Sequence, residues 1–333
     1  MARTLDDLAE LSGVSRATVS RVINGGPVSD ATRQRVMEVL ESTNYRPNLA
    51  ARNLASGRSG VVGVVMHVPA PLTFADAYFA ELLTGICDSL SSQAAGMMLW
   101  LGNRTKEETL DNILAMGMLD GVIVTADTID DPLVDGLRAS DMPVVLVGHR
   151  RADLDASYVD IDHEAAAQRI TDHLIQTGRR RIIHITGRTD SVSGRDRAIG
   201  FRRSLKKAGR SSEGAVIAGD YTHVSGYEVT RRLLADGVEF DALFCGNDNA
   251  ARGSYQALLE AGLSIPDDVA VAGFDDLDFA AELDPPLTTV RQGVGDIGHE
   301  AARTLLSLLD NPDSGPRRVL LPTELVVRRS TGE

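Results

Sequence analysis

Hydrophobic residues near the amino terminus recur at helical spacing and predict three short helices. Residues that can cap a helix, Thr4, Ser15 and Ser29, stand at the start of the three segments. The apolar residues of each segment can share one helical face. These are Leu5, Leu8 and Leu11 for the first helix, Val14, Val19 and Val22 for the second, and Val36, Val39 and Leu40 for the third. The pattern predicts an all-α domain over residues 1–46.

The spacing between the first two helices is that of a helix-turn-helix. Counted from Leu5, Ala9 is the fifth residue, Gly13 the ninth and Val19 the fifteenth. A helix-turn-helix needs a small residue where its helices cross and a residue tolerant of positive φ in the turn. It also needs a branched apolar anchor under the second helix, which Val19 supplies.

Polar and small residues of the second helix fall away from its valines and predict a DNA-binding surface. Arginines and small residues on that outward face suit contacts with base edges in a major groove. The outward residues are Arg16, Ala17, Ser20 and Arg21. Polar groups at helix starts and turns can hold phosphates. The candidates are Thr4, Ser15, Asn24, Ser29, Thr32 and Tyr45.

Residues 47–60 predict a hinge helix and linker. Asn48 can cap a helix of about eight residues, which is too short to be stable alone in water, so we expect a partner to order it. Leu54, with the small residues Ala51 and Ala55 on the same helix, suits an apolar wedge for a DNA minor groove.

From Val61 onward, β-branched runs alternate with amphipathic stretches of helix length. We expect strands at 61–66, 97–101, 121–125, 143–147, 181–186, 215–218, 241–245 and 269–273, and helices at 77–95, 105–116, 130–140, 163–177, 195–209, 223–236 and 247–261. Strands that are apolar throughout are typical of doubly wound parallel sheets. The segment is too long for one such sheet, so we expect two lobes. Their expected ranges are 61–160 with 291–320, and 161–290 with 321–330.

The net charge differs between these two parts of the chain. The whole protein has a formal net charge of −13, which opposes contact with DNA. Residues 1–60, however, contain eight arginines and six acidic residues, so they carry +2 and the remainder carries −15. The predicted DNA-binding domain is therefore the cationic part.

The cysteines and the apolar runs indicate the compartment. Cys87 and Cys245 lie in apolar surroundings without metal-ligand spacing, so we expect buried thiols in a reducing cytosol. We find neither a secretory signal pattern nor an apolar run of about 20 residues, and therefore expect a cytoplasmic protein with no membrane partner.

One glycine motif favours a different class of protein, a nicotinamide-dependent enzyme. Gly293, Gly295 and Gly298 form a GxGxxG between a strand-like and a helix-like segment. No βαβ unit can follow it, because the motif is close to the carboxyl end and the sequence VLLPTELVV suggests a closing hairpin. We also find no nucleophile elbow and no metal-spaced set of ligands, and expect neither an enzyme nor a cofactor.

Taken together, residues 4–65 resemble the headpiece and hinge of the lactose-repressor (LacI/GalR) family of bacterial transcription regulators. The segments GRDRAIGF, FCGNDNAARG, VAGFDD and PPLTTVRQ resemble that family's periplasmic-binding-protein-like core. The resemblance implies a homodimeric repressor of carbohydrate or nucleoside catabolic genes that binds a palindromic operator and responds to a sugar-like effector. The alternative is a stand-alone sugar-binding protein with the same core, which would not need residues 1–56.

Ligands of parallel sheets bind at the carboxyl ends of the strands, where several polar residues of this chain are expected. A guanidinium, an amide and a carboxylate suit a polyhydroxylated ligand. The resemblance assigns Arg197, Asn247 and Asp275 to the effector, with Tyr221 and Gln292 as further pocket positions and His67 and Phe79 as contacts of the first lobe.

Two features bear on the identity of the effector. Gly148 follows the strand at 143–147, where some sugar-responsive relatives have an acidic residue. The expected pocket has no cluster of basic residues beyond Arg197 and the nearby Arg195, which favours a neutral sugar or nucleoside over a phosphorylated one. Whether the effector acts as inducer or corepressor stays open.

Overall fold

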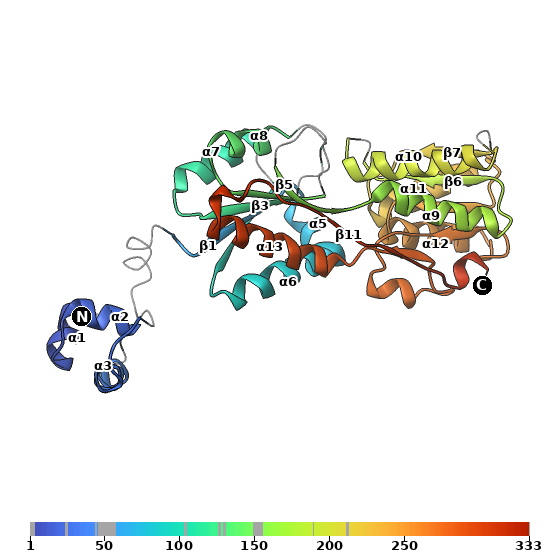
Figure 1. The fold of residues 1–333 in the computed structure, drawn as a ribbon. Coiled ribbons are helices and arrows are strands. Elements are labelled where there is room, and N and C mark those ends of the chain that lie inside the picture. Colours follow the sequence, from blue (N-terminus) through green and yellow to red (C-terminus); the bar gives the residue numbers. More distant parts are fainter. Residues whose placement is uncertain are drawn as a thin grey trace. The chain divides into compact units, whose positions relative to one another are not determined.

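The computed structural model describes residues 4–23, 26–43, 45, 58–102, 105–125, 128, 131–148, 156–188, 190–210 and 213–332. The chain divides into two compact units, residues 1–59 and residues 60–333. We call the first unit the headpiece and the second the core (Figure 1). Five residues predicted to contact DNA lie outside the described residues: Asn24, Asn48, Ala51, Leu54 and Ala55.

The headpiece contains the three predicted helices, α1 (Leu5–Ser12), α2 (Arg16–Ile23) and α3 (Asp30–Thr43). Thr4 caps α1 in a capping box with Asp7, and Gly13 ends the helix in the left-handed region with φ of 66°. The apolar faces meet in one cluster around Leu8 and Val19, which are both fully buried. The helical spacing of the apolar residues therefore predicted this unit correctly.

The first lobe of the core is built on a six-stranded sheet that is parallel throughout, in the order β11-β5-β4-β3-β1-β2. Helices α7 and α8 cover one face of the sheet, and α6 and α13 cover the other (Figure 1). Its elements are β1 (Val61–Met66), α5 (Ala70–Ala75), α6 (Ala77–Ser92), β2 (Gly96–Leu101), α7 (Lys106–Met116), β3 (Gly121–Thr125), α8 (Pro132–Ala139), β4 (Val144–Val147), β5 (Ser157–Ile161), α13 (Val294–Asp310), η2 (Pro312–Ser314) and β11 (Arg318–Leu321).

The second lobe has a four-stranded parallel sheet in the order β7-β6-β8-β9. Helix α9 packs against α10, and α11 packs against α12. Its elements are α9 (His163–Gln176), β6 (Ile182–Ile185), α10 (Val192–Lys207), β7 (Gly214–Ile217), α11 (His223–Ala235), β8 (Ala242–Cys245), α12 (Asp248–Glu260), β9 (Ala270–Ala272), η1 (Asp278–Ala281) and η3 (Arg329–Thr331). The predicted fold class, two doubly wound parallel sheets, is therefore confirmed.

The closing hairpin expected from VLLPTELVV is wrong. Strand β11 pairs in parallel with β5, whereas β12 (Glu324–Val326) pairs antiparallel with β10 (Thr289–Arg291). The two residues between β11 and β12 are Pro322 and Thr323, which do not favour the positive φ that a two-residue hairpin requires. The chain therefore continues from the sheet of the first lobe into a separate two-stranded sheet.

The expectation of two buried thiols is wrong for one of them. Cys245 is buried on β8, and burial raises the pKa of its thiol to about 12. Cys87 is exposed on α6, because it follows Ile86, whose side chain occupies the buried face of that helix. Apolar neighbours in the sequence did not distinguish the two faces.

The GxGxxG glycines lie at the contact between α13 and α6. A Cβ at Gly298 would clash with the carbonyl oxygen of Leu82, and a Cβ at Gly85 on α6 would clash with the carbonyl oxygen of Gly295. A Cβ at Gly295 itself would find only the carbonyl oxygen of Glu81, at 4.0 Å. Gly298 and Gly85 thus allow the backbones of α13 and α6 to approach closely.

We expect Gly298→Ala to lower the free energy of unfolding by about 2 kcal/mol, because the added methyl forces α13 away from α6. Gly295→Ala on the same helix is the matched control and should leave stability unchanged or raise it by less than about 1 kcal/mol. Thermal unfolding followed by circular dichroism measures both. Equal effects of the two substitutions would contradict the close-contact role of Gly298.

Candidate DNA-binding surface and effector cleft

The outward face of α2 carries the residues predicted to read bases. Arg16, Ala17 and Arg21 are exposed and Ser20 is half-buried, whereas Val19 on the opposite side is fully buried. Arg16 lies 3.5 Å from Asp6 in an ion pair whose two side chains are both about two-thirds exposed. Such an exposed pair is weak, so a DNA phosphate or base can replace Asp6 as the partner.

The predicted phosphate contacts lie mostly at helix starts. Ser15 accepts a hydrogen bond from the amide of Thr18 (3.2 Å), and Ser29 accepts one from the amide of Thr32 (3.4 Å). These hydroxyls therefore already serve as helix caps. Tyr45 packs half-buried against the headpiece core, where part of its ring has a structural role.

A cleft of about 490 Å³ lies in the core and is lined by both lobes. Residues at or after the carboxyl ends of β1, β3, β4, β5, β7, β8 and β9 line it, as expected for parallel sheets. All seven residues predicted for the effector line this one cleft: His67, Phe79, Arg197, Tyr221, Asn247, Asp275 and Gln292.

Arg197 is the central cation of the cleft and is almost fully buried. Its guanidinium carbon lies 3.6 Å from the centroid of the Phe274 ring, and Nη1 donates to the carbonyl oxygen of Gly246. Nε donates to Nδ1 of His163 at 3.4 Å. A stacked and hydrogen-bonded guanidinium is held in one orientation, so its remaining N–H groups can meet a ligand in a fixed geometry.

Asp275 is the buried carboxyl group opposite this cation. Its Oδ1 accepts a hydrogen bond from Nε2 of Gln292 at 2.5 Å. Burial raises the pKa of Asp275 well above its usual range, and nearby Arg197 opposes that shift.

Asn247 lines the same cleft. It caps α12 through Oδ1, which accepts a hydrogen bond from the amide of Ala250 at 2.9 Å. Its Nδ2 is left as the donor that can face a ligand.

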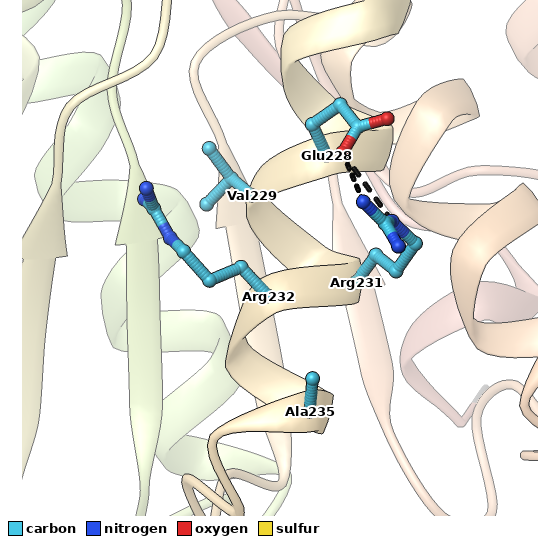
Figure 2. Close-up of a pocket in the computed structure, with 5 residues that line it drawn as sticks. All are labelled: Glu228, Val229, Arg231, Arg232 and Ala235. Carbon is cyan, nitrogen blue, oxygen red and sulfur yellow. Dashed lines mark hydrogen bonds and ion pairs between the residues drawn. The ribbon is translucent and has the colours of Figure 1, made fainter.

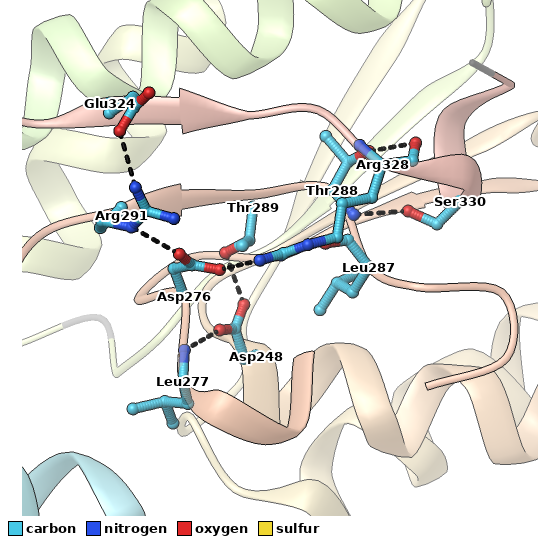
Figure 3. Close-up of polar contacts among 10 residues, drawn as sticks. All are labelled: Asp248, Asp276, Leu277, Leu287, Thr288, Thr289, Arg291, Glu324, Arg328 and Ser330. Carbon is cyan, nitrogen blue, oxygen red and sulfur yellow. Dashed lines mark hydrogen bonds and ion pairs between the residues drawn. The ribbon is translucent and has the colours of Figure 1, made fainter. Parts of the chain in front are cut away.

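An ion-pair network supports the loop that carries Asp275 (Figure 3). Asp276 accepts hydrogen bonds from Nε of Arg291 (2.7 Å) and Nη2 of Arg328 (2.6 Å). Asp248 accepts from the hydroxyl of Thr289 (2.6 Å), and burial raises the pKa of its carboxyl group to about 7. The side chain of Asp276 is thus engaged in holding β10 and the last residues of the chain.

Several charged residues line the cleft that the sequence did not identify. The cations are Lys106, Arg188 and Arg252, and the acids include Asp76, Asp131, Asp160 and Asp220. The expectation that the pocket has no cluster of basic residues beyond Arg197 and the nearby Arg195 is therefore wrong. Arg195 itself is not part of the lining and pairs with its neighbour Asp196 at 2.9 Å. Polar residues of α7, α8 and β5 reach the cleft only through the folding of the first lobe.

A smaller hollow of about 310 Å³ lies on the outer side of α11 (Figure 2). It is lined by side chains of that single helix, and two of them, Glu228 and Arg231, pair with each other at 2.9 Å. A ligand there would meet few groups from other elements, so the cleft is the better candidate site.

Two further properties concern the described part of the chain. Among those residues, no group of three histidine, cysteine or acidic side chains is placed to hold a metal ion. No described helix is both long and apolar enough to cross a membrane.

The chain combines a helix-turn-helix headpiece with a two-lobed core that has a cleft for a ligand. This combination defines the class of ligand-responsive transcription regulators. Comparison with known proteins gives the family. Residues 4–48 match the "bacterial regulatory proteins, lacI family", and residues 171–331 match the "periplasmic binding protein-like domain".

Relatives match along nearly the whole chain. The HTH-type transcriptional regulator CelR of Thermobifida fusca is 36% identical, and the alignment covers 98% of each protein. Catabolite control protein A of Priestia megaterium is 33% identical, with 98% of this chain and 99% of that protein covered. The chain belongs to the lacI family of bacterial regulatory proteins and is a DNA-binding transcription regulator.

Solved structures agree with this assignment. The Lac repressor dimer bound to operator and the anti-inducer ONPF superposes with a TM-score of 0.87 at 28% identity, covering 99% of both chains. A complex of the transcriptional regulator CelR with cellobiose gives a TM-score of 0.76 at 35% identity, covering 98% of this chain and 99% of that one.

Proposed function

We propose that this regulator is a cytoplasmic repressor of carbohydrate or nucleoside catabolic genes that binds a palindromic operator as a homodimer. One α2 helix of each subunit would enter a major groove, with Arg16, Ala17 and Arg21 toward the bases. The effector would occupy the cleft of the core. The observation that carries the proposal is the meeting of Arg197, Asp275 and other hydrogen-bonding groups in one cleft of a chain that also has a helix-turn-helix.

Two of the three additional cations of the cleft are already paired with acids, and the third, Arg252, lies over the ring of Phe279. A neutral, polyhydroxylated ligand is therefore the best fit to the cleft. Lys106 lies 3.0 Å from Asp131, and Arg188 lies 3.0 Å from Asp190, so neighbouring acids already neutralise these two side chains. The lining thus contains both donors and acceptors, which suits hydroxyl groups that both donate and accept. The CelR structure with cellobiose supports the same class of ligand.

Effector and operator would be coupled through the arrangement of the two lobes. A ligand that contacts both lobes favours one arrangement over the other, and an operator bound by two headpieces favours one as well. Each ligand therefore changes the affinity for the other.

A gel-shift experiment tests the proposal, using the full-length protein and DNA from upstream of its own gene. A thermal-shift experiment with cellobiose, ribose and adenosine tests the class of effector, because a bound ligand raises the melting temperature. Absence of a specific shift on that DNA, or a lack of stabilisation by any of these compounds, would count against the corresponding part of the proposal.

Leu54→Ala should weaken operator binding by at least tenfold and leave non-specific DNA binding unchanged. The reason is that an inserted leucine side chain unstacks a base step and bends the operator, whereas non-specific binding depends on phosphate contacts. Circular-permutation gel shifts measure the bend angle. A bend that is the same with Leu54→Ala as with the wild type would exclude the wedge.

A further inference from the structure

Asp160 is a buried carboxylate in the wall of the cleft whose role the sequence did not indicate. It lies near the carboxyl end of β5 and is only 2% exposed. It also lines the same cleft as Arg197 and Asp275. Burying a carboxylate is costly unless hydrogen bonds satisfy both of its oxygens, so the partners of each oxygen decide what this group does.

One oxygen of Asp160 is fully engaged. Oδ1 accepts a hydrogen bond from the amide of Ile161 at 2.8 Å and lies 3.1 Å from Nε2 of His163. Since Nε of Arg197 donates to Nδ1 of the same imidazole, Nε2 carries the proton that points to Asp160. These contacts engage Oδ1 and link it to Arg197 through the imidazole of His163.

The other oxygen, Oδ2, is buried and has no hydrogen-bond partner among the described residues. A buried charged group without a partner costs more than a buried neutral one, so proteins retain such a group where function requires it. His67 lines the same cleft, and its Nε2 is another buried atom without a partner in the described part of the chain. Two of the residues that line the cleft thus carry a buried polar atom without a partner.

The neighbouring strand leaves room beside Asp160. Strands β4 and β5 pair in parallel with Val147 opposite Val159, so the next residue, Gly148, comes beside Asp160. The amide of Gly148 donates to the carbonyl oxygen of Val159 at 3.2 Å, which continues the pairing. A Cβ at Gly148 would meet no atom of the described residues within 4 Å, so none of them fills the space on that side of the wall.

We propose that Asp160 is an effector-binding residue whose Oδ2 accepts a hydrogen bond from a hydroxyl group of the ligand. A carboxylate only accepts, so the ligand must present a donor here, and a phosphate or carboxylate of the ligand is excluded from this end of the cleft. Contact requires a small rotation of the side chain toward the space beside Gly148. The inference deepens the proposed function and rests on it.

Asp160→Asn tests this role because it changes one oxygen only. Asparagine can keep an acceptor toward Ile161 and His163 while it replaces Oδ2 with a donating NH₂ group. We expect the melting temperature without sugar to be unchanged or higher, since a buried carboxylate with one unpartnered oxygen is replaced by a neutral amide of the same shape. The dissociation constant for cellobiose, measured by isothermal titration calorimetry, should rise about tenfold or more.

Asp162→Asn is the matched control, because Asp162 lies two residues away and caps α9 instead of lining the cleft. It should leave the affinity for cellobiose unchanged. Monodeoxy analogues of cellobiose identify the hydroxyl group: one of them should bind wild-type protein about tenfold more weakly than cellobiose does, yet bind Asp160→Asn as well as cellobiose does.

The outcomes separate this inference from the proposed function. Equal affinity of wild type and Asp160→Asn for cellobiose would overturn the inference and leave the sugar-responsive function intact. A fall in melting temperature by several degrees without sugar would assign Asp160 a structural role and overturn the inference too. Failure of the wild type to bind either cellobiose or ribose would overturn the sugar class itself, and the role of Asp160 with it.

Discussion

Removal of residues 1–59 is expected to abolish specific operator binding, with a loss of affinity of at least about a thousandfold. The headpiece folds around its own apolar cluster and carries the exposed arginines of α2. The remaining chain carries a charge of −15, because the surplus of positive charge belongs to the first 60 residues. A core with this negative net charge repels the phosphates of DNA, so neither specific nor non-specific binding should persist.

Fluorescence anisotropy with labelled operator DNA measures this loss, and the salt dependence of the residual binding reports any remaining phosphate contacts. The control is sugar binding, which should be the same in the truncated and the full-length protein because the core is a separate compact unit. In the full chain, Arg21→Lys keeps the charge but loses the bidentate geometry, and should reduce discrimination between operator and random DNA. Operator binding by the truncated protein would contradict the assigned role of the headpiece.

Asp275→Asn should reduce the affinity for the effector by about a hundredfold and leave operator affinity unchanged in the absence of effector. Asp275 is buried beside Arg197, and a hydrogen bond from a ligand hydroxyl to a buried carboxylate contributes about 1.5–3 kcal/mol. Asparagine preserves the acceptor for Gln292 and tolerates the positive φ of 120° at this position. The substitution therefore changes charge more than shape.

Asp276→Asn, at the adjacent residue, is the matched control for stability. It weakens the ion pairs with Arg291 and Arg328, and should lower the free energy of unfolding by about 2 kcal/mol while leaving effector affinity intact. Titration calorimetry and thermal unfolding of both variants measure the two effects. If Asp275→Asn lost operator binding together with effector binding, Asp275 would be a structural residue.

Regular elements with a strong apolar period were predictable from the sequence. The three headpiece helices have apolar faces, and most core strands are apolar runs, so both can be recognised from neighbouring residues alone. Their predicted and observed bounds agree to within a few residues. Strand β5 was missed because its sequence, SYVDI, includes a serine and an aspartate that are buried only through the packing of the core. The short helix α5 was missed because it has too few residues to show a helical period.

The residues expected around the effector were predictable where they follow apolar strands. Asn247 and Asp275 come shortly after strands of the second lobe, and Arg197 lies on α10. The rule that ligands meet strand ends made this edge the expected site, and the family resemblance assigned the three residues to the effector. Lys106 and Asp131 come from the starts of helices α7 and α8, and no spacing in the sequence connects them to Arg197. Their ion pair and its place in the lining became visible only in the folded first lobe.

The sequence by itself determined the order of helices and strands, the separation of a cationic headpiece from an acidic core, and the class of protein. The first two follow from local periodicity, turn residues and charge, which act over a few residues of chain, and the class of protein follows from the resemblance of its motifs to a known family. Only the tertiary structure decided that β11 and β12 belong to different sheets, that Cys87 faces outward, and that Asp160 lies in the cleft with one oxygen unsatisfied. Those properties depend on contacts between segments far apart in the chain, and the physical reason is that burial and hydrogen bonding are set by whichever segments the fold brings together.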